Sequence, residues 1–160
     1  MRNIGVIALL GLMSTPAWSG NLSYKAGTGL DTTGFSGYVA IFSAAYESPL
    51  WGLIDQKIEA GLWVDREGKG GQGSFYGGYA VGMKVHPGVV YGQFFLGVAG
   101  ISNPDAYLSS VFQFTHDIGV GIEDKEGRAL GLNVKHISNA GLKSPNVGRN
   151  FFMVDIKFPF

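Results

Sequence analysis

The sequence predicts an all-β fold, an eight-stranded antiparallel transmembrane β-barrel with periplasmic termini. Apolar and polar residues alternate with a period of two in many segments, as β-strands with one buried face require. Of the 160 residues 46% are hydrophobic and only 15% are charged, against roughly 25% charged in soluble domains. No segment beyond the N-terminal region approaches the ~18 uninterrupted apolar residues of a membrane helix. The composition also leaves a soluble β-sandwich as an alternative.

The N-terminus has the features of a secretory signal peptide. Arg2 supplies a positive charge, an apolar run follows over residues 4–13, and Ala17 and Ser19 provide small residues at a cleavage site. The apolar run is too short to cross about 30 Å of hydrocarbon as a helix. We therefore expect residues 1–19 to be removed and residues 20–160 to form a single outer-membrane barrel domain.

The strands are predicted from this alternation, taken in chain order. Segments 22–30 and 35–47 alternate less regularly than the others. In segments 57–64, 75–84, 91–98 and 112–123, apolar residues alternate with a second set that includes glycine or charged residues. Segment 130–138 repeats the pattern. Segment 150–160 is the clearest, and its terminal aromatic residue is typical of bacterial outer-membrane barrels. Its apolar set is Phe152, Val154, Ile156, Phe158 and Phe160.

The predicted connections fall into two classes that alternate along the chain. Segments 48–51, 86–88 and 124–128 are short, whereas 65–73, 102–110 and 139–149 are longer. Short periplasmic turns and longer outer loops are typical of membrane barrels. The first outer connection, 31–34, is short and fits this rule less well. Both termini are then expected on the periplasmic side.

An eight-stranded barrel has an interior just wide enough to be filled by side chains, so a conducting pore is not expected. Several charged residues have inward parity, and we interpret them as a buried, paired network rather than as catalytic groups. They are Asp55, Lys57, Glu59, Lys84, Asp117, Glu123, Lys135, Asp155 and Lys157.

His136 and Ser138 are the candidate catalytic pair. Two residues apart on a strand, they share the lipid-facing side, and Asn150 on the next strand has the same parity. Ser138 could attack an ester carbonyl while His136 takes its proton, with Asn146 or backbone N–H groups after Ser138 stabilising the oxyanion. The alternative is that these side chains only bind headgroups. His116, on the preceding strand, shares this face and could lie close to the site, but it is interpreted as an interfacial histidine.

The segment His136-Ile137-Ser138-Asn139-Ala140-Gly141-Leu142-Lys143, followed by Pro145-Asn146-Val147-Gly148, resembles the active-site signature of the PagL family of outer-membrane lipid A 3-O-deacylases. The Gly127-Arg128 turn region and the closing Lys157-Phe158-Pro159-Phe160 also fit, so the resemblance covers nearly the whole mature chain. It implies an eight-stranded barrel with the active site on its outer wall. It further implies hydrolysis of the ester-linked 3-hydroxyacyl chain at position 3 of lipid A, without a metal or cofactor.

Carried over by position, the resemblance makes Ser138 the nucleophile and His136 the general base. Asn146 falls where the family has an asparagine proposed for the oxyanion hole. Asn139 and Gly141 are expected to shape the turn after the nucleophile and so to position the substrate.

The chain departs from the family pattern at Asn150, where a glutamate that orients the histidine is expected. An amide can hold a neutral imidazole tautomer, but it cannot offset an imidazolium charge, so we expect a weaker or differently tuned deacylase with Asn150 in the catalytic set. Lys143 and Arg149 flank the outer loop and are candidate contacts for lipid A phosphates. The alternative is that both side chains are only solvated.

The remaining observations limit the partners. The chain has no cysteine and a net charge of zero, which excludes thiolate metal sites and gives no basic patch for nucleic acid. Expected partners are lipopolysaccharide, through its lipid A, and the lipids of the outer membrane of a Gram-negative bacterium, with a homodimer left open. Two alternatives are a non-catalytic barrel with a structural or adhesive role, and a lipid A acyltransferase with an interior acyl pocket.

Overall fold

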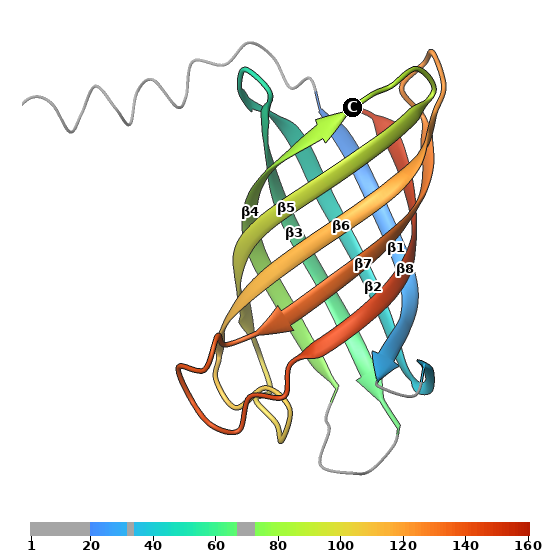
Figure 1. The fold of residues 1–160 in the computed structure, drawn as a ribbon. Coiled ribbons are helices and arrows are strands. Elements are labelled where there is room, and N and C mark those ends of the chain that lie inside the picture. Colours follow the sequence, from blue (N-terminus) through green and yellow to red (C-terminus); the bar gives the residue numbers. More distant parts are fainter. Residues whose placement is uncertain (1–19, 32–33, 67–72) are drawn as a thin grey trace, which may run out of the picture.

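The computed structural model is a closed antiparallel barrel, which confirms the predicted fold class (Figure 1). It describes residues 20–31, 34–66 and 73–160, so the predicted signal peptide lies outside the described residues. Consecutive strands pair, and β1 closes the barrel against β8. The strands are β1 (Asn21–Asp31), β2 (Gly34–Trp51), β3 (Ile54–Asp65), β4 (Ser74–Val85), β5 (Val90–Ile101), β6 (Phe112–Glu123), β7 (Ala129–Ser138) and β8 (Arg149–Pro159).

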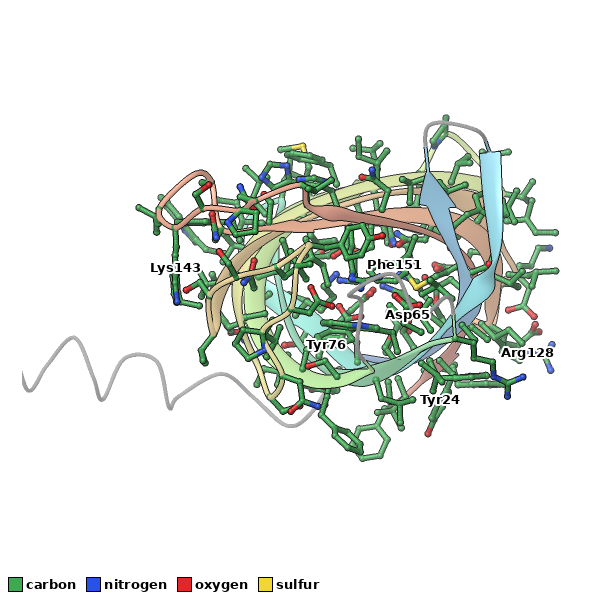
Figure 2. All side chains as sticks on the ribbon, turned by 90° about the horizontal axis from the view of Figure 1, so that it is seen from below. Tyr24, Asp65, Tyr76, Arg128, Lys143 and Phe151 are labelled. Carbon is green, nitrogen blue, oxygen red and sulfur yellow. The ribbon has the colours of Figure 1, made fainter. Side chains whose placement is uncertain are left out.

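The two faces of the wall follow the predicted alternation. On β7, Leu130, Leu132 and Val134 are 52%, 47% and 41% exposed, while the residues between them are buried. Figure 2 shows the same division elsewhere, with Tyr24 on the outside and Phe151 in the interior. An apolar outer face around a polar interior is the arrangement of a transmembrane barrel. No helix among the described residues is long and apolar enough to cross a membrane.

Paired charges fill the middle of the barrel, as the inward parity predicts. Asp117 accepts hydrogen bonds from Lys57 at 2.6 Å and from Lys135 at 2.8 Å. Lys135 also donates to Glu59 at 2.9 Å. All four side chains are at most 5% exposed. Each charge therefore lies beside opposite charge, which offsets part of the cost of removing it from water.

The predicted turn at 48–51 is wrong, because β2 continues to Trp51 and the chain turns at Gly52. Pro49, within this segment, lies next to a register shift, and β1 no longer pairs with β2 beyond Glu47. Proline lacks the N–H that a strand ladder needs, so within sheets it is confined to such edges and irregularities. Gly52 has a φ of 58°, a backbone conformation that glycine adopts without steric cost.

A cluster of apolar side chains closes the interior at the end opposite the C-terminus. Trp63 lies 5.9 Å from Phe151, measured between ring centroids. Ile137 of β7 and Leu108, from the loop that joins β5 to β6, belong to the same cluster and are fully buried. The loop that joins β7 to β8 lies at this end, beside the β5–β6 loop, whereas the C-terminus lies at the other (Figure 1). This cluster underlies the wall that carries the candidate catalytic residues.

Candidate active site

His136 and Asn150 face each other across neighbouring strands. They are directly opposite in the register of β7 and β8, and Nδ1 of His136 lies 2.8 Å from Oδ1 of Asn150. Because an amide oxygen only accepts hydrogen bonds, the imidazole donates from Nδ1. The neutral ring then carries its lone pair on Nε2, the nitrogen that a general base needs.

Ser138 lies on the same outer face as His136, two residues further along β7 and opposite Phe114 of β6. Ile137, between the two, points inward and is fully buried in the apolar cluster. Its burial fixes the outward direction of both neighbours, since side chains on a strand alternate. The structure records no hydrogen bond of the Ser138 hydroxyl to any described residue. Catalytic hydrogen bonds often tighten only when substrate is bound.

Asn139 builds the turn that follows Ser138. It is fully buried, and its Oδ1 accepts a hydrogen bond from the backbone N–H of Gly141 at 3.0 Å. Its Nδ2 donates to the carbonyl of Lys143 at 2.8 Å. Gly141 has a φ of 79° and Ala140 a φ of 52°, so the chain reverses direction within these residues. Asn139 thus holds the shape of the loop that follows Ser138.

Asn146 reaches back to the start of the same loop. Its Oδ1 accepts a hydrogen bond at 3.0 Å from the backbone N–H of Asn139. That N–H directly follows Ser138 and was one of the expected oxyanion donors, but it is occupied by this contact. The amide nitrogen of Asn146, at the other end of the same group, is not used in this contact.

The β5–β6 loop is hydrogen-bonded to the β7–β8 loop and supports it. This contact was not predicted from the sequence. The carbonyl of Tyr107 accepts hydrogen bonds from the backbone N–H groups of Val147 and Gly148 at 3.2 and 3.3 Å. Ser109 donates to the carbonyl of Lys143 at 3.0 Å. The β5–β6 loop is itself held by Asp105, whose Oδ1 accepts from the N–H groups of residues 107 and 108 at 2.8 and 2.9 Å. An aspartate at the start of a turn is the only sequence signal for this arrangement.

The structure places Arg149 in the interior, which does not support the expected phosphate contact. Its side chain is 7% exposed and pairs with Asp65 at 2.9 Å and Asp105 at 2.7 Å. The guanidinium also lies over the ring of Tyr107, 4.5 Å from its centroid. Arg149 is the first residue of β8, and since Asn150 faces outward, Arg149 must face inward. Figure 2 shows Asp65 inside the barrel and Lys143 outside it, on the exposed loop.

Two residues outside the predicted catalytic set contact His136. His116 lies opposite it on β6, with the ring centroids 5.7 Å apart. Gly148 packs against the edge of the imidazole, where an added Cβ would lie 2.8 Å from Cε1 of His136. Gly148 also has a φ of 76°. The parity of His116 gave a signal for its position, whereas the contact of Gly148 depends on how the loop folds.

Comparisons with known proteins identify a family, two relatives and a solved structure that are similar to this chain. A family model described as "Lipid A 3-O-deacylase (PagL)" matches residues 15–159. The lipid A deacylase PagL of Pseudomonas aeruginosa is 37% identical over 67 residues, which are 40% of this chain and 39% of that protein. The lipid A deacylase PagL of Bordetella bronchiseptica is 36% identical over 56 residues, 35% of this chain and 32% of that protein. Each matched stretch thus spans less than half of the relative.

A solved structure, described as the crystal structure of the outer membrane enzyme PagL, superimposes with a TM-score of 0.66 at 21% sequence identity. The superposition covers 88% of this chain and 99% of that one, and it shows that the two share a fold. The family model covers the barrel from before β1 to the end of β8, including every candidate site residue. The chain therefore belongs to the PagL family.

Proposed function

We propose that the protein is an outer-membrane serine esterase that hydrolyses the ester-linked 3-hydroxyacyl chain at position 3 of lipid A. The observation that carries the proposal is the hydrogen bond from His136 to Asn150, on the apolar outer wall and on the same face as Ser138. Membership of the PagL family supports lipid A as the substrate. A nucleophile and a base that face lipid suit a substrate that is itself a lipid.

The position of the site along the barrel supports action in the outer leaflet. Ser138 ends β7 at the end with the long loops, opposite the C-terminus (Figure 1). With periplasmic termini, this end lies at the outer surface, where lipopolysaccharide resides. Polar groups on the lipid face cost only about 0–1 kcal/mol near the interface. The wall can therefore carry His136, Ser138 and Asn150 at this depth without a large loss of stability.

The reaction follows from the arrangement of the side chains. Ser138 Oγ attacks the ester carbonyl while Nε2 of His136 takes its proton. The amide nitrogen of Asn146 donates to the oxyanion that forms. Collapse of this intermediate breaks the bond to the sugar oxygen, which receives the proton from His136. Water, activated by His136, then hydrolyses the acyl-enzyme and releases a 3-hydroxy fatty acid.

Asn150 determines how strongly the base is supported. Its amide oxygen orients the imidazole but carries no charge to balance the imidazolium that forms when Ser138 is deprotonated. A carboxylate at this position would supply that charge, and charge-assisted hydrogen bonds are roughly twice as strong as neutral ones. We therefore expect a slower deacylase than a counterpart with glutamate at 150.

Lys143 is the proposed contact for a phosphate of lipid A. It is exposed on the β7–β8 loop, which also carries Asn146 (Figure 2). An ammonium group there can approach the phosphate of a substrate whose acyl ester lies at Ser138. Its contribution is expected in binding rather than in the chemical step.

The two alternatives differ from this proposal in what they require. An acyltransferase with an interior acyl pocket is disfavoured, because the cavity in the middle of the barrel, beside Lys57, Glu59 and Tyr76, has a volume of about 10 Å³. That is room for about one water molecule. A second cavity, of about 210 Å³, is lined by the charged side chains Asp55, Lys84 and Glu123, which do not suit an acyl chain. A non-catalytic barrel would not need the oriented His136 base. It remains the outcome to be tested.

Mass spectrometry of lipid A from cells that produce the full chain tests the proposal. We expect loss of one 3-hydroxyacyl group with the natural sequence and no loss with Ser138→Ala. Ser48→Ala is the matched control, because Ser48 is equally half-buried on the outer face of β2, towards the turn at Gly52. Unchanged lipid A in cells that contain the folded natural protein would favour the non-catalytic barrel.

A further inference from the structure

His116 and His136 bring two imidazole rings side by side on the outer face of the barrel. The two residues are directly opposite on β6 and β7, where Cβ atoms of paired residues are about 4.5–5.5 Å apart. Both side chains point out of the barrel, and their ring centroids are 5.7 Å apart with an interplanar angle of 46°. Two imidazoles that converge in this way are the ligands that zinc, nickel and copper ions prefer.

The separation of the rings fits one shared ion. A zinc ion binds an imidazole nitrogen at about 2.0–2.1 Å, which places the centroids of two rings on one ion roughly 5–6 Å apart. The observed 5.7 Å lies in this interval. We expect a change in the rotamer of His116 alone to bring one nitrogen of each ring to the same ion, with His136 held in place by Asn150.

The hydrogen bond to Asn150 prepares His136 for such a role. Nδ1 of His136 donates to Asn150 at 2.8 Å, so the lone pair is on Nε2, the tautomer that a metal ligand needs. Metal-binding histidines almost always donate their other N–H to an oxygen in this way. Gly148 leaves space beside this nitrogen, because a Cβ there would lie 3.5 Å from Nε2.

We propose that His116 and His136 form a binding site for a divalent transition-metal ion of the zinc, nickel and copper class, and that its occupation inhibits the enzyme. The described residues contain no group of three or more histidine, cysteine, aspartate and glutamate side chains that could hold a metal ion. The ion therefore has two protein ligands, and water completes its coordination. An ion on Nε2 occupies the lone pair that would accept the proton of Ser138. The inhibition rests on the proposed function, whereas the binding does not.

The same geometry predicts selectivity against magnesium and calcium. These ions take oxygen ligands, and the pair offers only imidazole nitrogens. Ions that bridge lipid phosphates at the membrane surface are thus expected to leave the site free. Few other side chains of the chain can bind such ions through nitrogen or sulfur, since it has three histidines and no cysteine. The third histidine, His86, lies outside the site in the turn between β4 and β5.

Zinc titration of the purified, tag-free full chain tests the proposal, with calorimetry for binding and release of fatty acid for activity. Loss of only the hydrogen-bond partner of a metal-bound histidine costs roughly 10–100-fold in affinity. His116→Ala and His116→Gln should therefore bind zinc at least about 10-fold more weakly than the natural protein. His86→Ala should bind it as the natural protein does. Activity of each variant is compared with and without zinc, and magnesium serves as the control ion.

The outcomes separate the two proposals. Zinc binding that His116→Ala and His116→Gln weaken and His86→Ala does not, together with zinc inhibition that His116→Gln relieves, supports the site. Zinc binding of this kind in a protein without deacylase activity supports the metal site and removes the proposed function. If folded His116→Gln, checked by circular dichroism, binds zinc as tightly as the natural protein or is equally inhibited, the metal site is wrong.

Discussion

The side-chain oxygen of Asn146 accepts a hydrogen bond at 3.0 Å from the backbone N–H of Asn139, the residue that follows Ser138. This contact fixes the orientation of the Asn146 amide, because the oxygen is held by the loop and the nitrogen must point elsewhere. The same hydrogen bond joins the start of the β7–β8 loop, at Asn139, to a residue near its end, Asn146. The loop therefore presents one oriented donor next to the end of β7.

Asn146→Asp should abolish most of the activity while the loop keeps its shape. The carboxylate retains the oxygen that Asn139 contacts, but it removes the donor and places negative charge near the developing oxyanion. Loss of one such donor costs about 100- to 1,000-fold in kcat. Asn103→Asp, in the neighbouring loop, is the control and should retain activity. Steady-state kinetics with purified lipid A would exclude this role if kcat of Asn146→Asp were unchanged.

Asn150→Glu should raise the activity. The glutamate would accept the same Nδ1 hydrogen bond and also balance the imidazolium charge. A gain of about 10-fold in kcat corresponds to roughly 1.4 kcal/mol of additional transition-state stabilisation. Asn150→Ala, which removes the hydrogen bond, should instead lower kcat. A decrease in kcat with Asn150→Glu would show that this account of Asn150 is wrong.

Gly148→Ala should displace the base. The new Cβ would lie 2.8 Å from Cε1 of His136, closer than non-bonded carbon atoms approach, so the ring or the loop must move. A misplacement of about 1 Å can cost 100-fold in rate. Gly88→Ala is the matched control, with a φ of 78° and nothing within 4 Å of the added atom. If kcat fell equally in both variants, the loss would be due to backbone strain and not to displacement of His136.

Arg149→Leu should destabilise the barrel. Its guanidinium is buried between Asp65 and Asp105, and removal of one partner of a buried ion pair costs about 3–5 kcal/mol. Thermal unfolding followed by circular dichroism measures the loss. A variant with normal stability and a raised KM would instead support the phosphate contact that was expected from the sequence.

Lys143→Gln should weaken substrate binding without a change in stability. The side chain is exposed, and an exposed ion pair contributes about 0.2–1 kcal/mol, so KM should rise by up to roughly fivefold. The difference from the natural protein should shrink at high salt, because salt screens exposed charges. A KM that is independent of both the substitution and the salt concentration would argue against a phosphate contact.

The sequence predicted the barrel and the outward position of the candidate residues because alternation is a local property. Each strand has to separate lipid-facing from interior side chains, and this separation is visible at every second residue. The inward charges Asp117 and Lys135 are paired in the structure as their parity predicts. The same rule applied to Arg149 would have placed it inside, but the strand was predicted to begin one residue later.

The supporting contacts could not be predicted, because they join segments that are distant in the sequence. Tyr107 receives hydrogen bonds from the β7–β8 loop, yet nothing in its own segment alternates or marks a partner. The error at 48–51 has a different cause. Pro49 is a turn signal on local grounds, and only the end of the β1 pairing shows that a strand can tolerate it there.

The burial of Ile137 between His136 and Ser138 limits how β7 can change in length. Insertion or deletion of one residue in this strand would turn the histidine and serine into the packed interior and move the isoleucine to the lipid face, since side chains alternate at every position. A single insertion or deletion would therefore disrupt both the packing of the barrel and the candidate catalytic pair. Variation in length is therefore expected in the loops, while β7 tolerates only replacement of one side chain by another.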